Sequence, residues 1–351
     1  MVMPTFLLYG ANGYTGRLIA RETVVRGLHP VLAGRNAEAV GALARELGLK
    51  HRIFSLEDAA ATRAGLEGVQ AVLHCAGPFA HTAQPMVDAC LEARVHYLDI
   101  TGEIRVFEAL AARDTEAMAA GILLLPGVGF DVVPSDCLAA HLHRRLPAAK
   151  RLTLAFQGIG RYSRGTATTI IENLPHGGAV RRSGMLTNVP AAWRTRVIDF
   201  GQGPTLAVTI PWGDIATAYR STGIGDIEVY TAVSRWQLRL MRLSRLFHWI
   251  LRTSLVQNFF KRRIQAGPPG PSDEERARGR TYLWGEVEDG QGRRLVSRLR
   301  GPEGYTFTML TALAAMTHVL NSDAPPGYQT PSLAYGPDFV LEVPGVERVD
   351  E

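Results

Sequence analysis

The sequence is poor in cysteine. Its three cysteines, Cys75, Cys90 and Cys137, include no C-x-x-C pair, and such a sparse, odd set is typical of a reducing compartment rather than of a disulfide-stabilised domain. The first ten residues, MVMPTFLLYG, lack the basic region and the long apolar region of a signal peptide. No uncharged apolar run reaches the length of about 18 residues that a spanning helix requires. These absences predict a cytoplasmic protein without a transmembrane segment.

The sequence also lacks the patterns of metal and nucleic-acid sites. The ten histidines are scattered and include no H-x-x-x-H pair, so no metal site is expected. The formal net charge of +5 comes from 38 basic and 33 acidic residues, which is a mild excess. Because no nucleic-acid-binding motif accompanies that excess, we do not expect a nucleic acid as partner.

The first half of the chain alternates short apolar strands with helices. The expected strands are TFLLYG, HPVLAGR, HRIFSL, VQAVLHCAG, HYLDI and ILLLPG. Parallel strands need long crossover connections such as helices, so this order predicts a doubly wound parallel sheet of the Rossmann type. After Pro147 the segments RLTLAFQG, TLAVTIPW, IEVYTAV, RTYLWGEVED and RRLVSRLRG predict a second α+β domain with a mostly antiparallel sheet.

Three glycines follow the first expected strand in the segment YGANGYTGRL, residues 9–18. Gly10, Gly13 and Gly16 are three residues apart, which differs from the best-known spacing G-x-G-x-x-G. Glycine at this turn lets a pyrophosphate approach the backbone, and the next helix offers its free N–H groups to phosphate. The alternative is a glycine-rich turn that binds nothing, but the strand–turn–helix context favours a dinucleotide site.

Arg35 ends the second expected strand and Asn36 follows it, at the point where NAD-binding proteins usually carry an acidic residue. A guanidinium there can pair with a 2′-phosphate and stack on adenine. The sequence therefore favours NADPH over NADH, unless Arg35 is only a solvated residue at the start of a helix. Asn36 is also the expected N-cap of that helix.

The ends of the later strands carry further candidates, because ligands of open α/β sheets bind beside the carboxyl ends of the strands. Asp99 is expected to cap the next helix, and Cys75 is expected to pack rather than to act as a nucleophile. The candidates near the nicotinamide and the substrate are Cys75, Gly77, Pro78, Gly102, Glu103, Gly129, Phe130 and Asp131.

Residues 234–264 read as one long amphipathic helix with an apolar stripe and many arginines. The stripe contains Trp236, Leu240, Leu243, Phe247, Ile250, Leu251, Leu255 and Phe259. Most such helices bury their stripe against a core, and this interpretation is favoured. The alternatives are that the segment 236–263 lies on an anionic membrane surface or covers an acyl-chain site.

Taken together, the motifs YGANGYTGRLIA, LAGRN, HCAGPF, HYLDITGE, PGVGFDVVPSD and GYQTPSLAYGPDFVLE resemble the saccharopine dehydrogenase-like family, and most of all its trans-acting enoyl reductase branch. The resemblance implies an NADP-binding Rossmann domain, residues 1–147, joined by the C-terminal segment 325–351. Residues 148–324 would form a second, substrate-binding or dimerisation domain. By this resemblance, the cofactor NADP(H) would be held by Gly10, Ala11, Asn12, Gly13, Tyr14, Thr15, Gly16, Arg35, Cys75, Ala76, Gly77 and Pro78.

The resemblance and the basic amphipathic segment together predict an NADPH-dependent oxidoreductase that reduces an activated C=C bond. The substrate would be an apolar lipid or polyketide-type molecule linked to CoA or to a carrier. The proton-donor candidates are Asp131, Tyr162 and His176. An imine- or opine-forming reductase is the alternative enzyme, and a non-catalytic NADP-binding or lipid-surface protein is the alternative of another class. Peripheral membrane contact and a homodimer through the second-domain sheets are the expected assemblies.

Overall fold

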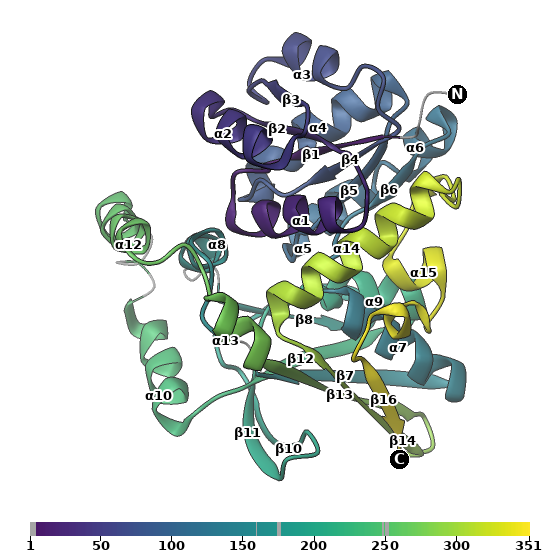
Figure 1. The fold of residues 1–351 in the computed structure, drawn as a ribbon. Helices are drawn as coiled ribbons and strands as arrows, with labels where there is room; N and C mark the ends of the chain where they lie inside the picture. The colour runs from purple at the N-terminus through teal and green to yellow at the C-terminus, as the bar shows by residue number, and fades with distance from the viewer. Residues whose placement is uncertain (1–4, 159, 174–176, 248, 250–252) are drawn as a thin grey trace. The chain divides into compact units, whose positions relative to one another are not determined.

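The computed structural model describes residues 5–158, 160–173, 177–247, 249 and 253–351 (Figure 1). Its contacts divide the chain into two compact units. The first comprises Met1–Asp131 and Tyr305–Ala334, and the second comprises Val132–Gly304 and Tyr335–Glu351. Each unit has its own sheet. The chain passes from one unit to the other after Asp131, after Gly304 and after Ala334.

The first unit is built on a seven-stranded sheet in the order β15-β6-β5-β4-β1-β2-β3. Every described pair in this sheet is parallel. The strands are β1 Phe6–Tyr9, β2 Val31–Gly34, β3 His51–Ile53, β4 Ala71–His74, β5 His96–Asp99, β6 Leu123–Leu125 and β15 Gly327–Tyr328. The predicted Rossmann-type sheet is confirmed, and β1, β2 and β4 are buried along their whole length, as strands covered on both faces should be.

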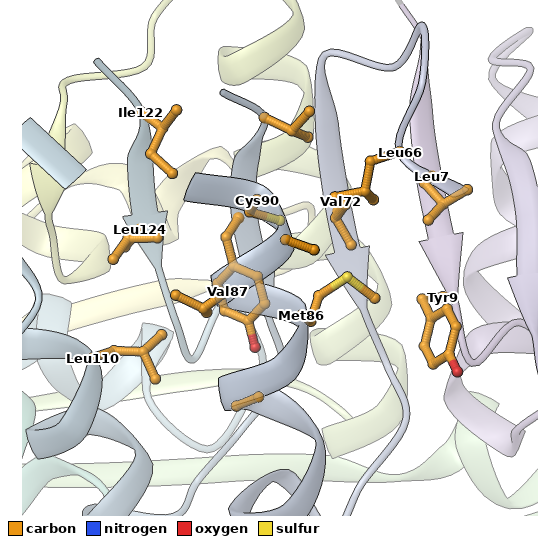
Figure 2. Close-up of a cluster of buried hydrophobic side chains, with 14 of the residues drawn as sticks. Leu7, Tyr9, Leu66, Val72, Met86, Val87, Cys90, Leu110, Ile122 and Leu124 are labelled. Atoms are coloured by element: carbon orange, nitrogen blue, oxygen red, sulfur yellow. The ribbon is translucent and has the colours of Figure 1, made fainter. Parts of the chain in front are cut away.

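The crossover helices of the first unit are α1 Tyr14–Val25, α2 Ala37–Leu47, α3 Ala59–Gly65, α4 Phe79–Ala93, α5 Ile104–Ala111 and α6 Asp114–Ala120, and α14 Gly304–Leu320 joins them from the end of the chain. Figure 2 shows how α4 covers the sheet, with Met86, Val87 and Cys90 beside side chains of the strands. Local signals define α2 well, because Asn36 caps its start and Gly48 ends it in the left-handed conformation at φ +65°.

The second unit is built on a nine-stranded mixed sheet. Its order is β10-β11-β12-β7-β13-β14-β16, with β8 paired to β12 and β9 to β8. Only the β12–β7 pair is parallel among the described pairs, which confirms the predicted mostly antiparallel sheet. The strands are β7 Ala149–Gln157, β8 Gly178–Arg182, β9 Met185–Val189, β10 Thr195–Asp199, β11 Pro204–Thr209, β12 Asp226–Ala232, β13 Arg280–Asp289, β14 Arg294–Pro302 and β16 Glu347–Asp350.

The helices of the second unit differ in how deeply they pack. They are α7 Val133–Arg145, α8 Arg164–Asn173, α9 Asp214–Thr222, α10 Arg235–Leu243, α12 Ser254–Ala266 and α13 Asp273–Arg278, with 3-10 turns at Ser244–Phe247 and Phe339–Glu342. The short helix α15 Pro331–Tyr335 belongs to the first unit through its residues Pro331–Ala334. Helix α7 lies close on β13, because a Cβ built on Gly285 would lie 2.6 Å from Leu142 Cδ1. No residue of α10 or α12 is buried.

The C-terminal segment differs from its expected assignment. Residues 325–351 were expected to join the first domain, whereas the structure groups Tyr305–Ala334 with the first unit and Tyr335–Glu351 with the second. The cause is strand pairing. Strand β15 adds in parallel to β6 of the first sheet, whereas β16 pairs antiparallel with β14 of the second.

The expectation of one long, core-packed helix over 234–264 needs a correction. The segment forms α10, a 3-10 turn at Ser244–Phe247 and then α12. Trp236, Leu240 and Leu243 of the expected stripe are 65%, 47% and 50% exposed. Among the described residues, no helix is long and apolar enough to cross a membrane.

Candidate functional site

The carboxyl ends of the parallel strands bring the predicted turns of the first unit to one edge of its sheet. Strand β1 lies between β2 and β4, with Tyr9 opposite Ala33 on one side and His74 on the other. The turns that begin at Gly10, Arg35 and Cys75 are therefore neighbours. Such an edge is where open α/β sheets bind their ligands.

The β1–α1 turn packs so tightly that two of its glycines cannot carry a side chain. Gly10 has φ +81°, and a Cβ built on it would lie 2.7 Å from the backbone nitrogen of Ala76. A Cβ on Gly16 would lie 2.3 Å from the carbonyl oxygen of Gly10. Gly13 is different, because it is exposed and its nearest neighbour would be the Gly10 oxygen at 3.2 Å. Gly10 and Gly16 thus shape the turn, and Gly13 leaves its outer side open.

The N-terminus of α1 has the properties of an anion site. Gly13 is the N-cap and supplies no side-chain cap, and the first turn contains no acidic residue. A helix presents its first N–H groups and the positive end of its dipole at this point. Arg17 donates from Nε to the Asn12 carbonyl at 3.0 Å, and the ring of Tyr14 packs edge-on against Tyr305 at 5.0 Å. The turn Gly10–Gly16 has no room for side chains at two of its glycines, and it leads into a helix start without a side-chain cap. This combination fits the pyrophosphate of a dinucleotide.

Arg35 and Asn36 have different surroundings at the end of β2. Arg35 is exposed, and with the other described residues it makes no hydrogen bond or ion pair, so its guanidinium is available to a phosphate. Asn36 accepts a hydrogen bond from the Ala39 backbone N–H at 2.9 Å and so caps α2. Asn12 lies against this strand end, because a Cβ on Gly34 would be 3.1 Å from its Oδ1. These positions fit an adenosine 2′-phosphate beside Arg35, and cofactor contact by Asn12 and Asn36 stays a prediction.

The turn after β4 is shaped by backbone packing and by Glu103. Burial raises the pKa of the Cys75 thiol, which disfavours the thiolate and is consistent with the packing role expected for Cys75. Glu103 accepts hydrogen bonds from the backbone N–H groups of Phe79 at 2.8 Å and Ala80 at 3.0 Å. Its carboxylate therefore occupies the N-terminus of α4. The Gly77–Pro78 peptide is cis, and contact of this turn with a cofactor stays a prediction.

Asp99 positions two of the loops at this edge and is not a helix cap. Its carboxylate accepts hydrogen bonds from Thr101 N and Gly127 N, both at 2.9 Å, and from the Tyr97 hydroxyl at 2.7 Å. Burial raises its pKa to about 6, although these donors act in the opposite direction. The helix-cap expectation was wrong, because α5 begins only at Ile104. The buried carboxylate instead ties the loop after β5 to the loop after β6.

Asp131 closes the loop after β6 and is the candidate acid of the first unit. A Cβ built on Gly102 would lie 2.7 Å from Asp131 Oδ2, so this carboxyl lies directly on the glycine backbone. No hydrogen bond to another described residue stabilises the carboxylate. Burial raises the pKa of Asp131 to about 7. A carboxyl of this kind keeps a proton near neutral pH and can donate it.

The residues just before Asp131 are held by α14. Phe130 donates from its backbone N–H to Thr308 Oγ1 at 3.0 Å, and its ring lies 5.8 Å from that of Phe307. A Cβ on Gly129 would lie 3.0 Å from Thr308 Cγ2. Gly129 and Phe130 therefore have packing roles, and their predicted contact with a cofactor is untested by this geometry.

The other two proton-donor candidates, Tyr162 and His176, do not belong to the first unit and its sheet edge. Tyr162 belongs to the second unit and is 44% exposed. His176 lies outside the described residues. Within the described part of the chain, no group of His, Cys, Asp or Glu could hold a metal ion.

The second unit has a polar hollow of about 580 Å³ on its sheet. Its arginines and carboxylates satisfy one another, for example Arg194 with Glu228 at 2.9 Å and Arg196 with Glu286 at 2.8 Å. This network was not predictable from local sequence patterns, because its members come from separate strands. Because these charged groups already pair with one another, the hollow has the features of a structural ion-pair network. We therefore do not choose it as the candidate site.

Comparison with known proteins agrees with this geometry. Residues 6–125 match the family model of the saccharopine dehydrogenase NADP binding domain. The first unit contains a saccharopine dehydrogenase-type NADP-binding domain. The predicted resemblance is thereby confirmed, and so is NADP(H) as the cofactor of this domain.

Two curated relatives are named trans-acting enoyl reductase. The one from Mycobacterium ulcerans is 32% identical over 147 residues, which are 40% of this chain and 35% of that protein. The one from Mycobacterium leprae is 32% identical over 148 residues, with the same shares. The chain thus matches about a third of the length of these relatives.

Among solved structures, saccharopine dehydrogenase (L-Glu forming) from Saccharomyces cerevisiae shares the fold over the whole chain. The TM-score is 0.67 at 12% identity, and the match covers 99% of this chain and 100% of that one. A likeness at this identity concerns the fold alone. It extends the saccharopine dehydrogenase architecture from the NADP-binding domain to the second unit.

Proposed function

We propose that this chain is an NADPH-dependent oxidoreductase that reduces an enoyl group, a C=C bond conjugated to a carbonyl. The substrate would be an apolar lipid or polyketide-type molecule linked to CoA or to a carrier. The observation that supports this proposal best is Asp131, a carboxyl with a pKa of about 7 at the same sheet edge as the glycine cradle. The names of the curated relatives support the choice of an enoyl group.

The cofactor would be held by backbone geometry and one cation. Gly10 and Gly16 form the tight turn, and the uncapped start of α1 would face the pyrophosphate. The exposed guanidinium of Arg35 would pair with the 2′-phosphate and so select the phosphorylated cofactor. When bound, NADPH supplies a hydride to the substrate carbon β to the carbonyl.

Asp131 would supply the proton that completes the reduction. Addition of hydride to the β carbon moves an electron pair to the α carbon, which must then take up a proton. The protonated carboxyl of Asp131 donates it and becomes a carboxylate. Asp99 would act one step away, because its hydrogen bonds hold the backbone of Thr101, which precedes the Gly102 that contacts this acid, and of Gly127 in the loop that leads to it.

The test is a comparison of substrates and variants in purified protein. Native protein should consume NADPH with enoyl thioesters and not with a 2-oxo acid plus an amine, which is the reaction of the imine-reductase alternative. Asp131→Asn should lower kcat by about 10²–10³-fold, with unchanged NADPH affinity. The exposed carboxylate variant Glu67→Gln is the control and should retain full activity.

The pH profile adds a second readout. Because donation requires the protonated form, native kcat should fall as the pH rises through about 7, and this limb should be absent from the residual activity of Asp131→Asn. Turnover with imines alone would contradict the enoyl proposal. Tight NADPH binding without turnover on any substrate would favour the non-catalytic alternative.

A further inference from the structure

The segment Arg235–Ala266 of the second unit exposes large apolar side chains on two formed helices. In α10 and in the turn that follows it, Trp236, Leu240, Leu243 and Phe247 are 65%, 47%, 50% and 46% exposed. In α12, Leu255, Phe259 and Phe260 are 83%, 60% and 37% exposed, and Trp249 between the helices is 63% exposed. A group of exposed apolar residues this large within one segment marks an interaction surface.

The same segment carries positive charge only. No aspartate or glutamate occurs between Arg235 and Ala266, and the basic residues are Arg235, Arg239, Arg242, Arg245, Arg252, Lys261, Arg262 and Arg263. Arg235, Arg239 and Arg242 are exposed and recur at helical spacing beside the stripe of Trp236, Leu240 and Leu243. A helix with an apolar stripe and basic flanks is suited to the boundary between lipid headgroups and acyl chains.

Contacts on the inner side hold the segment in place and leave the apolar side outward. Gln257 donates to the Ile171 carbonyl at 3.0 Å, and Lys261 pairs with Glu172 at 2.6 Å, which fastens α12 to α8. Arg245 donates to the carbonyl oxygens of Ala191 and Ala192. Figure 1 shows α8 beside α12 and shows α10 away from the strands of the second sheet. The exposed stripes therefore belong to ordered helices.

A second copy of the chain does not suit this surface. In a twofold dimer the same patch meets itself, and two patches that are exclusively cationic would repel each other. A membrane with anionic lipids offers both an apolar layer and opposite charge, and tryptophan is enriched at that boundary. We propose that the described helical parts of this segment, Arg235–Phe247 and Ser254–Ala266, form a docking surface for an anionic lipid membrane. This inference does not depend on the reductase activity.

The experiment measures binding of the full-length protein to vesicles by sedimentation. The vesicles contain phosphatidylcholine alone or with about a third phosphatidylglycerol, an anionic lipid. We expect at least tenfold tighter binding to the anionic vesicles, weakened by added salt because exposed charges are screened. Trp236→Ser/Phe259→Ser should lose tenfold or more in affinity, and so should Arg239→Glu/Arg242→Glu.

Matched controls alter equally exposed residues elsewhere in the same unit. Met185→Ser/Val197→Ser removes apolar side chains that are 68% and 65% exposed on β9 and β10. Arg278→Glu/Arg293→Glu makes the same charge change as the arginine variant at exposed positions outside the segment. Both controls should bind as the native protein does.

Three outcomes would overturn the proposal. The first is equal affinity for neutral and anionic vesicles, and the second is an equal loss of vesicle affinity in the control variants and the segment variants. The third is a segment that mediates self-association or binds an acidic carrier protein and does not bind vesicles. A thermal unfolding scan of each variant shows that any loss is not due to misfolding.

Discussion

The glycine turn Gly10–Gly16 and the cationic segment Arg235–Ala266 are held in opposite ways. At Gly10 and Gly16 of the turn, built Cβ atoms would come within 2.7 and 2.3 Å of neighbouring backbone atoms, so these two positions leave no space for a side chain. In the segment, no residue of the two helices is buried, and a few polar contacts fasten them to α8 and to Ala191–Ala192. Gly10 and Gly16 should therefore tolerate no side chain, whereas the segment should tolerate many substitutions without loss of stability.

Gly16→Ala should have the largest effect on the free energy of unfolding. The added Cβ would meet the Gly10 carbonyl oxygen at 2.3 Å. Overpacking costs about 1–3 kcal/mol, and we expect the upper end of that range because the contact is with backbone. Gly13→Ala is the matched control, because its Cβ would meet that oxygen at 3.2 Å. Denaturant unfolding should separate the two variants, and NADPH titration should show weaker binding for both. Equal free energies of unfolding for the two variants would contradict the statement that Gly16 is more tightly packed than Gly13.

Asp99→Asn should change how stability depends on pH. The pKa of Asp99 is about 6 in the folded chain and 3.8 for an unperturbed aspartate, so between these pH values the folded state holds a proton that the unfolded state has lost. Native stability should therefore lose roughly 2 kcal/mol as the pH rises from about 4 to about 6, out of roughly 3 kcal/mol over the whole transition, and the variant should not show this loss.

Unfolding of the two proteins across this pH range isolates the effect of Asp99. His74, whose pKa burial lowers to about 3, contributes stability that rises with pH over the same range. It does so in both proteins, so the difference between them removes it. A difference that stays constant from pH 4 to pH 6 would show that Asp99 does not titrate as proposed.

Arg35→Ala should lower NADPH affinity roughly ten- to hundredfold and leave NADH affinity unchanged. A hydrogen bond to a charged group contributes about 1.5–3 kcal/mol, and the 2′-phosphate is present only in NADPH. Fluorescence titration with both nucleotides measures the preference. Arg21→Ala, which removes an exposed guanidinium paired with Glu46 on the same unit, should keep it. Equal losses for NADH and NADPH would assign Arg35 another role.

Leu240→Ala in α10 should have the smallest effect. Its side chain is 47% exposed, so the free energy of unfolding should change by less than about 0.5 kcal/mol. Leu154→Ala on β7 makes the same truncation at a residue that is 1% exposed and should cost about 3 kcal/mol. Comparable losses at both positions, measured by denaturant unfolding, would mean that α10 packs in solution.

Much of the first unit was predictable because its signals are local. Apolar runs separated by helices specify parallel strands, and Asn36 and Gly48 mark the ends of α2 through their own side chain and backbone. The glycine turn is recognisable from its three glycines together with the expected strand before them and the expected helix after them, all of which are close in sequence. The role of Asp99 was not predictable, because one of its hydrogen-bond donors, Gly127, is far away in sequence and follows the neighbouring strand of the sheet. The other two donors, Tyr97 and Thr101, are close to Asp99 in sequence.

The sequence alone determines the composition, the alternation of strands and helices along the chain, and the glycine turn. The last two depend on residues within a few positions of one another. The exposure of Arg235–Ala266, the pairing of β16 with β14 and the raised pKa of Asp131 are decided by the tertiary structure. An amphipathic stripe has the same sequence whether it faces a core or water, and a carboxyl has the same chemistry until burial changes its solvation. Only the packing of distant segments distinguishes these cases.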